Sequence, residues 1–147
     1  MRVIGIDLGS RRIGVAASDA SGTLASPLEV VERGADHGVD HARLALIVEE
    51  VGAERVVVGL PLALSGRPTA AARSAMAEAA EMAAVLAVPV ETYDERLTTV
   101  VAHAALAAGG TRSRRRRAVV DKSAAAVILQ SWMDRRAADR ATEATRP

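Results

Sequence analysis

Three carboxylates occupy positions from which a folded chain could do chemistry: Asp7, Glu95 and Asp121. Asp7 directly follows the short apolar run Val3–Ile6, so we expect it at the end of a buried strand. An ionised carboxylate so close to a core needs a partner, and a divalent cation is a common one. Asp7 could instead only accept hydrogen bonds from backbone N–H groups of its turn, and for this residue alone the two interpretations weigh equally.

Glu95 lies in the tripeptide Asp94-Glu95-Arg96, where a second apolar run, Val88–Tyr93, ends. In a sheet with crossover connections, the ends of such strands are where sites form. The alternative for the tripeptide by itself is a solvated surface ion pair, which is the commoner meaning of adjacent opposite charges.

Asp121 is placed by helical spacing. The pattern predicts a last helix from about Ala118 to Arg136, in which Asp121 shares one face with Ala125, Ile128 and Trp132. Because this face should pack on the sheet, the carboxylate should point toward the protein. The alternative is an acid that only stabilises the helix N-terminus through the helix dipole.

Three carboxylates directed to one sheet edge would form a site of hard oxygen ligands, which suits Mg²⁺ or Mn²⁺. Two such ions about 4 Å apart can activate a water and stabilise the leaving oxygen of a phosphoryl displacement. Five of the six residues from Arg112 to Arg117 are arginine, and this run shortly precedes Asp121. Its cations could neutralise substrate phosphates, although such a run is more often a solvated loop.

The composition excludes several other classes of chemistry. The chain has 147 residues and no cysteine, so disulfides, thiolate zinc sites and cysteine nucleophiles are absent. It has no Phe, which weakens any binding mode based on aromatic stacking. We find neither a signal-peptide core nor an apolar stretch of membrane-spanning length, and we expect a cytoplasmic protein with no membrane partner. His37, His41 and His103 match no motif and are interpreted as surface or helix-face residues.

The spacing of apolar residues and turn signals predicts an α/β domain over residues 1–137 and a loose tail over 138–147. Short connections make the first three strands antiparallel, whereas a strand–helix–strand succession later in the chain requires a parallel crossover, so the sheet should be mixed. The expected strands are Val3–Ile6, Ile13–Ala17, Leu24–Val31, Arg55–Leu60 and Val88–Tyr93. The first expected helix carries Leu44 to Val51 and ends at Gly52. The others run from Ala72 to Leu86, from Thr98 or Thr99 to about Ala108, and over the last helix described above.

Four ordered motifs resemble the YqgF (RuvX) family over residues 1–137: DLGSRRIGVAASD at 7–19, GLP at 59–61, DERLTT at 94–99 and DKSAAAVILQSW at 121–132. Members are described as Holliday junction resolvases or pre-16S ribosomal RNA nucleases. The resemblance implies a three-layer ribonuclease H-like fold, with a mixed five-stranded sheet of order 3-2-1-4-5 flanked by helices. One departure is that the family usually carries an Asn where this chain has Ala63-Leu64-Ser65-Gly66.

By this resemblance, Asp7, Glu95 and Asp121 are the catalytic metal ligands. The substrate-binding groups that it implies are Arg12, Arg96, Arg112, Arg114, Arg115, Arg116, Arg117 and Lys122. The implied enzyme is a Mg²⁺-dependent nuclease that matures the 5′ end of pre-16S rRNA, with pre-rRNA or branched DNA and ribosomal particles as partners, as a monomer or a homodimer.

Two alternatives are a resolvase of four-way DNA junctions and a non-catalytic nucleic-acid-binding module. The second is disfavoured because all three acids are present. The turn after Asp7 also resembles the phosphate-binding turn of two-lobed ATPases, but a chain of 147 residues has material for one lobe only.

Overall fold

The computed structural model describes residues 1–98 and 123–145. Within them, five strands form one sheet in the order β3-β2-β1-β4-β5, as the family resemblance implied. The strands pair antiparallel across β1–β2 and β2–β3 and parallel across β1–β4 and β4–β5, so the sheet is mixed. The strands are β1 (Val3–Leu8), β2 (Arg12–Ser18), β3 (Ala25–Glu32), β4 (Arg55–Leu60) and β5 (Val90–Asp94).

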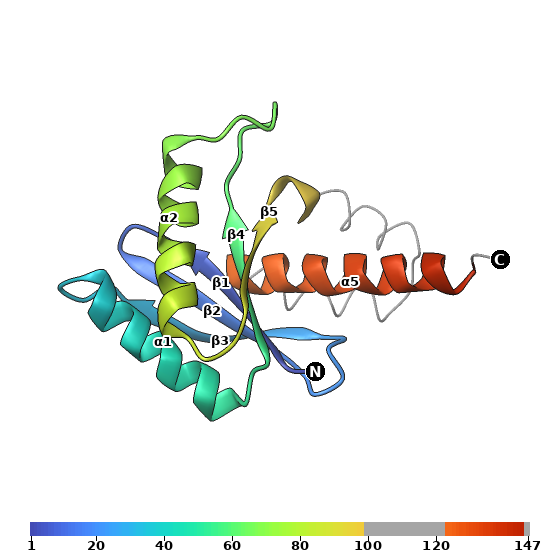
Figure 1. Cartoon of the computed structure of the whole chain (residues 1–147), viewed down its shortest axis with the longest axis horizontal. Helices are drawn as coiled ribbons and strands as arrows, with labels where there is room; N and C mark the ends of the chain where they lie inside the picture. Colours follow the sequence, from blue (N-terminus) through green and yellow to red (C-terminus); the bar gives the residue numbers. More distant parts are fainter. Residues whose placement is uncertain (99–122, 146–147) are drawn as a thin grey trace.

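Helices cover both faces of the sheet and give three layers (Figure 1). Helices α1 (His37–Val51) and α2 (Ala70–Val85) lie on one face, and α5 (Ala124–Ala144) lies on the other. Helix α1 ends at Gly52, as expected, because this glycine adopts the left-handed conformation that a side chain disfavours (φ 71°). No helix in residues 1–98 or 123–145 is both long and apolar enough to cross a membrane.

Alternation along the strands divides the core into two clusters, one for each face. Toward α1 and α2, the buried side chains include Ile4, Ile6, Val58, Leu44 and Met82. Toward α5, they include Val3, Val57, Tyr93, Ile128 and Leu129. Since Val3 faces α5, the alternation places Asp7 on the same side of β1, which positions its carboxylate beside the first turn of α5.

The ends of two helices differ from the expectation. Helix α5 begins at Ala124, after Ser123 in extended conformation accepts a hydrogen bond from the Ala126 N–H. The helix continues to Ala144, so residues 138–144 are helical rather than a loose tail. Their side chains are exposed, but alanine, arginine and glutamate are strong helix formers and extend the helix without packing.

In the segment where a helix was expected to begin at Thr98 or Thr99, the helical conformation starts at an earlier residue. Residues 96–98 are already helical, and Thr98 donates its hydroxyl to the Glu95 carbonyl at 2.7 Å instead of capping the helix. The remainder of that expected helix lies outside the described residues.

Candidate active site

Asp7 and Glu95 both lie at the edge of the sheet where the three parallel strands end, which we call the carboxylate edge. Asp7 is near the end of β1, and Glu95 directly follows β5. Strand β4 lies between them and contributes Gly59 at this level. A Cβ on Gly59 would lie 3.1 Å from both Cγ and Oε2 of Glu95, so the missing side chain is what leaves room for the Glu95 carboxylate.

Asp7 and Glu95 both lie in surroundings that disfavour their charged forms. Burial raises the pKa of Asp7. Burial also raises the pKa of Glu95, and repulsion from Asp7 and then from Asp94 raises it further. Within the described part of the chain, no side chain donates a hydrogen bond or forms an ion pair with either carboxylate. Two partly buried acids that repel one another in this way form a donor set that a divalent cation would stabilise.

Asp121, the third expected ligand, lies outside the described residues, as do Lys122 and the arginines of 112–117. The nearest described residue is Ser123, the N-cap of α5. Ser123 lines the same surface cavity as Asp7, Arg12 and Gly14, with a volume of about 510 Å³. The cavity extends over β3 from Pro27 to Val30, and so forms a groove that begins at the Asp7 carboxylate.

The two described arginines that the sequence assigns to substrate differ in their surroundings. Arg12 lines the cavity, and its guanidinium forms an exposed ion pair with Glu32 at 2.9 Å. Arg96 is turned toward Asp94, to which its Nε and Nη2 donate, while Nη1 donates to the Leu64 carbonyl. The structure therefore brings Arg12 to the Asp7 cavity and leaves Arg96 paired with its sequence neighbour.

A second cluster of titratable side chains was missed by the sequence analysis. His41 lies on a face of α1, as one half of its interpretation had it, but it is only 2 % exposed and contacts Glu78 of α2, so it is not a surface residue. His37 precedes it by one helical turn and lies near the same carboxylate. The available signal was the four-residue spacing of the two histidines, which aligns them on one helix face. This cluster lies with α1 and α2, on the opposite side of the sheet from α5.

The architecture defines the class of protein, a domain with a ribonuclease H-like fold of the RuvC type. The structure superimposes on RuvC of Thermus thermophilus in complex with a Holliday junction substrate with a TM-score of 0.60, 20 % identity and coverage of 95 % of this chain and 96 % of that one. A second Thermus thermophilus RuvC structure gives a TM-score of 0.58 with 97 % of both chains covered. At this identity, the likeness establishes the fold.

The chain belongs to the RuvX family, whose model, described as Holliday junction resolvase, matches residues 1–135. A relative from Leifsonia xyli subsp. xyli is 48 % identical over 95 % of this chain and 87 % of its own length. Another from Mycolicibacterium paratuberculosis is 50 % identical over 95 % of this chain and 84 % of its own. Both carry the name "Putative pre-16S rRNA nuclease".

Proposed function

We propose that the chain is a divalent-metal-dependent nuclease that hydrolyses phosphodiester bonds in structured RNA, with the 5′ end of pre-16S rRNA as its substrate. The observation that carries the proposal is the pair formed by Asp7 and Glu95, two partly buried carboxylates at one sheet edge: burial raises the pKa of both, and repulsion from Asp7 raises that of Glu95 further. The names of the family's relatives support the choice of RNA.

Asp7, Glu95 and Asp121 would hold the metal, and Mg²⁺ fits an all-carboxylate donor set. Such an ion supplies a polarised water and neutralises charge on the leaving oxygen. Asp121 is two residues before Ser123, which lines the cavity with Asp7. Two peptide steps span at most about 7.6 Å, so chain connectivity allows Asp121 to join the other two acids.

The remaining site residues would bind the substrate backbone. Arg12 lies in the cavity beside Asp7, and its exposed pair with Glu32 is weak enough to exchange for a phosphate. The arginines of 112–117 and Lys122 precede Ser123 in the chain and would add cationic contacts. Arg96 stays a predicted substrate group, which would have to exchange Asp94 for a phosphate oxygen.

The test compares substrates and metal in one experiment. Purified protein is offered a pre-16S rRNA fragment and a four-way DNA junction, each with Mg²⁺ and with EDTA. We expect cleavage of the RNA with Mg²⁺ alone. Selective cleavage of the junction would replace RNA maturation by junction resolution, the activity that the family model's description names. Binding without cleavage of either substrate would indicate a non-catalytic module.

Asp7→Asn tests the role of the carboxylate pair, with Glu50→Gln on the exposed face of α1 as the matched carboxylate-to-amide control. We expect Asp7→Asn to lower the cleavage rate by more than about 100-fold, since even groups that only orient metal ligands contribute about 10–100-fold. Glu50→Gln should cleave at the wild-type rate. An Asp7→Asn protein with unchanged turnover contradicts the proposed site.

A substrate in ribosomal RNA maturation implies a cytoplasmic location and contact with ribosomal particles, which we propose as further properties of the same function. Cosedimentation of the protein with precursor 30S particles tests the second. Loss of cosedimentation after ribonuclease treatment would place the contact on RNA.

A further inference from the structure

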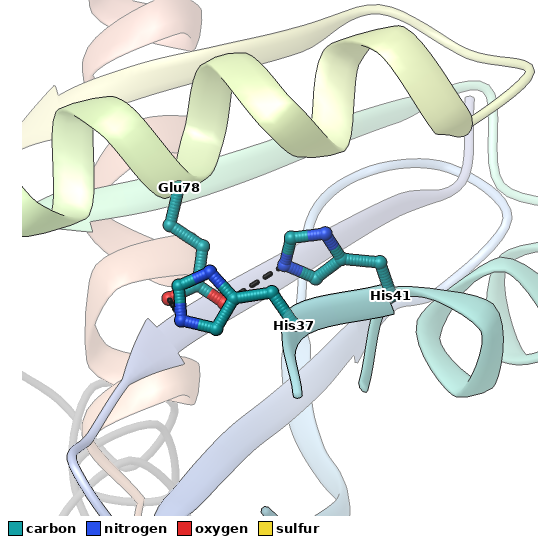
Figure 2. Close-up of side chains that lie close together, drawn as sticks. All are labelled: His37, His41 and Glu78. Atoms are coloured by element: carbon teal, nitrogen blue, oxygen red, sulfur yellow. Dashed lines mark hydrogen bonds and ion pairs between the residues drawn. The ribbon is translucent and has the colours of Figure 1, made fainter. Parts of the chain in front are cut away.

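On the opposite face of the sheet from α5, three side chains converge from two helices (Figure 2). His37 and His41 come from the first turns of α1, and Glu78 comes from the middle of α2. His41 Nε2 lies 2.8 Å from Glu78 Oε2, and His37 Nε2 lies 3.9 Å from Glu78 Oε1. One nitrogen or oxygen from each residue can be chosen so that all three atoms lie within 4.8 Å of one another.

The hydrogen bond of the second His37 nitrogen, Nδ1, sets the tautomer of this ring. Its Nδ1 lies 2.8 Å from Oε2 of Glu81, one turn after Glu78 on α2. When Nδ1–H donates to this carboxylate, the neutral ring presents the lone pair of Nε2 toward Glu78. A histidine held by a carboxylate through its other nitrogen is the usual environment of a metal-binding imidazole.

The buried charges around the cluster do not balance. The Asp40 and Glu78 side chains are only 3 % and 5 % exposed, and both accept hydrogen bonds from the single guanidinium of Arg33. With neutral histidines, two buried carboxylates therefore face one cation among the described residues. Unbalanced buried charge is costly, so either a proton on a histidine or a metal ion should supply the missing positive charge.

We propose that His37, His41 and Glu78 bind a transition-metal cation of the Zn²⁺ type. Two imidazole nitrogens and one carboxylate are a known zinc donor set that leaves a fourth position open. Ligand atoms on one tetrahedral zinc are about 3.4 Å apart, which lies between the two contacts to Glu78. On binding, His41 Nε2 would release the proton of its hydrogen bond to Glu78 Oε2, and this 2.8 Å contact would widen so that both atoms bind the ion.

The site opens to solvent and reaches the turn that follows Asp7. His37 and Glu78 line a cavity of about 530 Å³ together with Gly9 and Ser10, which follow Asp7 by two and three residues. Arg33 links the two regions, because its Nε donates to the Gly9 carbonyl at 3.0 Å while its Nη atoms bind Glu78. A metal ion bound to Glu78 would therefore compete with the Arg33 guanidinium, which also binds the turn after Asp7.

Zinc binding to the full chain can be measured without reference to nuclease activity. The metal-free protein is titrated with Zn²⁺ by calorimetry in excess Mg²⁺, which occupies the carboxylate site. A separate metal-free sample is loaded with Co²⁺ in place of Zn²⁺, as a spectroscopic probe of tetrahedral nitrogen and oxygen ligands. We expect one Zn²⁺ per chain and a visible Co²⁺ absorption band.

His37→Ala is the informative variant because the side chain is 53 % exposed and its loss should leave the fold intact, which circular dichroism checks. We expect it to weaken Zn²⁺ binding at least tenfold, and Glu81→Gln to weaken it by about tenfold through the orienting hydrogen bond. His103→Ala, the third histidine of the chain, serves as control and should bind as the wild type.

The zinc site would be overturned if the wild type bound no Zn²⁺, which would leave a proton-bridged ion pair only, or if His37→Ala and His103→Ala had equal affinities. Asp7→Asn separates the two metal sites. The Asp7→Asn protein should still bind Zn²⁺. Loss of Zn²⁺ binding in this variant would place the ion at the carboxylate edge and would also refute the proposal.

Discussion

At the scale of single residues, the positions of Asp7 and Glu95 destabilise the charged forms of their carboxylates. Both have a raised pKa in the folded protein because burial disfavours the charged form, and Glu95 is also repelled by Asp7. A carboxyl group with a raised folded pKa contributes its full stability below the unfolded pKa, and that contribution is lost as the pH rises through the folded pKa. The site is thus destabilised at neutral pH unless a cation binds.

We therefore expect Asp7→Asn to stabilise the metal-free protein at pH 7, by about 0.5–1 kcal/mol once solvent screening is allowed for. The gain should vanish below the ordinary aspartate pKa of 3.8, where Asp7 is protonated in both states. Urea denaturation in EDTA at several pH values measures this. Added Mg²⁺ should stabilise the wild type but not the variant, and a destabilised Asp7→Asn protein at pH 7 would contradict the account.

Gly59 is the second residue on which the site depends. In Gly59→Ala, the new Cβ would lie 2.5 Å from Ile128 Cδ1 and 3.1 Å from Glu95 Oε2. We expect a loss of about 1–3 kcal/mol in the free energy of unfolding, as for other overpacked positions, together with reduced cleavage. Gly14→Ala is the matched control in the same sheet, because its nearest neighbours lie at 3.6 Å. Equal unfolding free energies for the two variants would show that Gly59 is not constrained by packing.

At the scale of elements, most of the fold could be predicted from the sequence. The strand Arg55–Leu60 is a continuous apolar run stopped by Pro61, and β4 has the same bounds. The apolar positions of the last helix, Ala125, Ile128 and Trp132, are buried on one face as the spacing predicted. These elements could be predicted because the side chains that are buried recur at the spacing of a strand or a helix.

Other features were not visible in this way because they depend on contacts between distant elements. The residues 138–144 carry no apolar stripe, and their helix reflects propensity alone. His41 looks like a polar helix residue until the fold places Glu78 of another helix beside it. For the candidate site, the placement of Asp7 and Glu95 at one edge was predictable, whereas the pairing of Arg96 with Asp94 was foreseen only as an alternative for the tripeptide.

The Arg33 side chain connects several elements of the fold. It follows β3 and binds Asp40 of α1, Glu78 of α2 and the Gly9 carbonyl. We expect Arg33→Met to cost about 3–5 kcal/mol, because it leaves two buried carboxylates without their cation. Arg43→Met, which removes only a partly exposed pair with Glu29, should cost less than about 1 kcal/mol. Chemical denaturation of both variants at pH 7 tests the difference, and similar losses would contradict a special role for Arg33.

At the scale of the whole molecule, the net charge is only +1, so binding to a polyanion has to rely on where the cations lie. The α5 side of the sheet carries the cavity with Asp7 and Arg12. The arginine run ends at Arg117, six residues before Ser123, which lines this cavity. Our proposal that this run binds substrate requires its positive charge to lie beside the carboxylate edge rather than spread over the surface.

The salt dependence of binding distinguishes this arrangement from diffuse attraction. Each phosphate contact that is lost reduces the slope of log K against log salt by about 0.7–0.9, so the double substitution Arg115→Gln/Arg116→Gln should reduce it by up to about 1.4–1.8. The matched double substitution Arg73→Gln/Arg140→Gln changes the net charge equally at exposed positions on α2 and at the far end of α5, and should leave the slope unchanged. Fluorescence anisotropy with a labelled pre-16S rRNA fragment, at salt concentrations from about 50 to 200 mM, measures both slopes. If the two doubles lower the slope equally, only net charge attracts the RNA, and the run from Arg112 to Arg117 is a solvated loop without a place in the site.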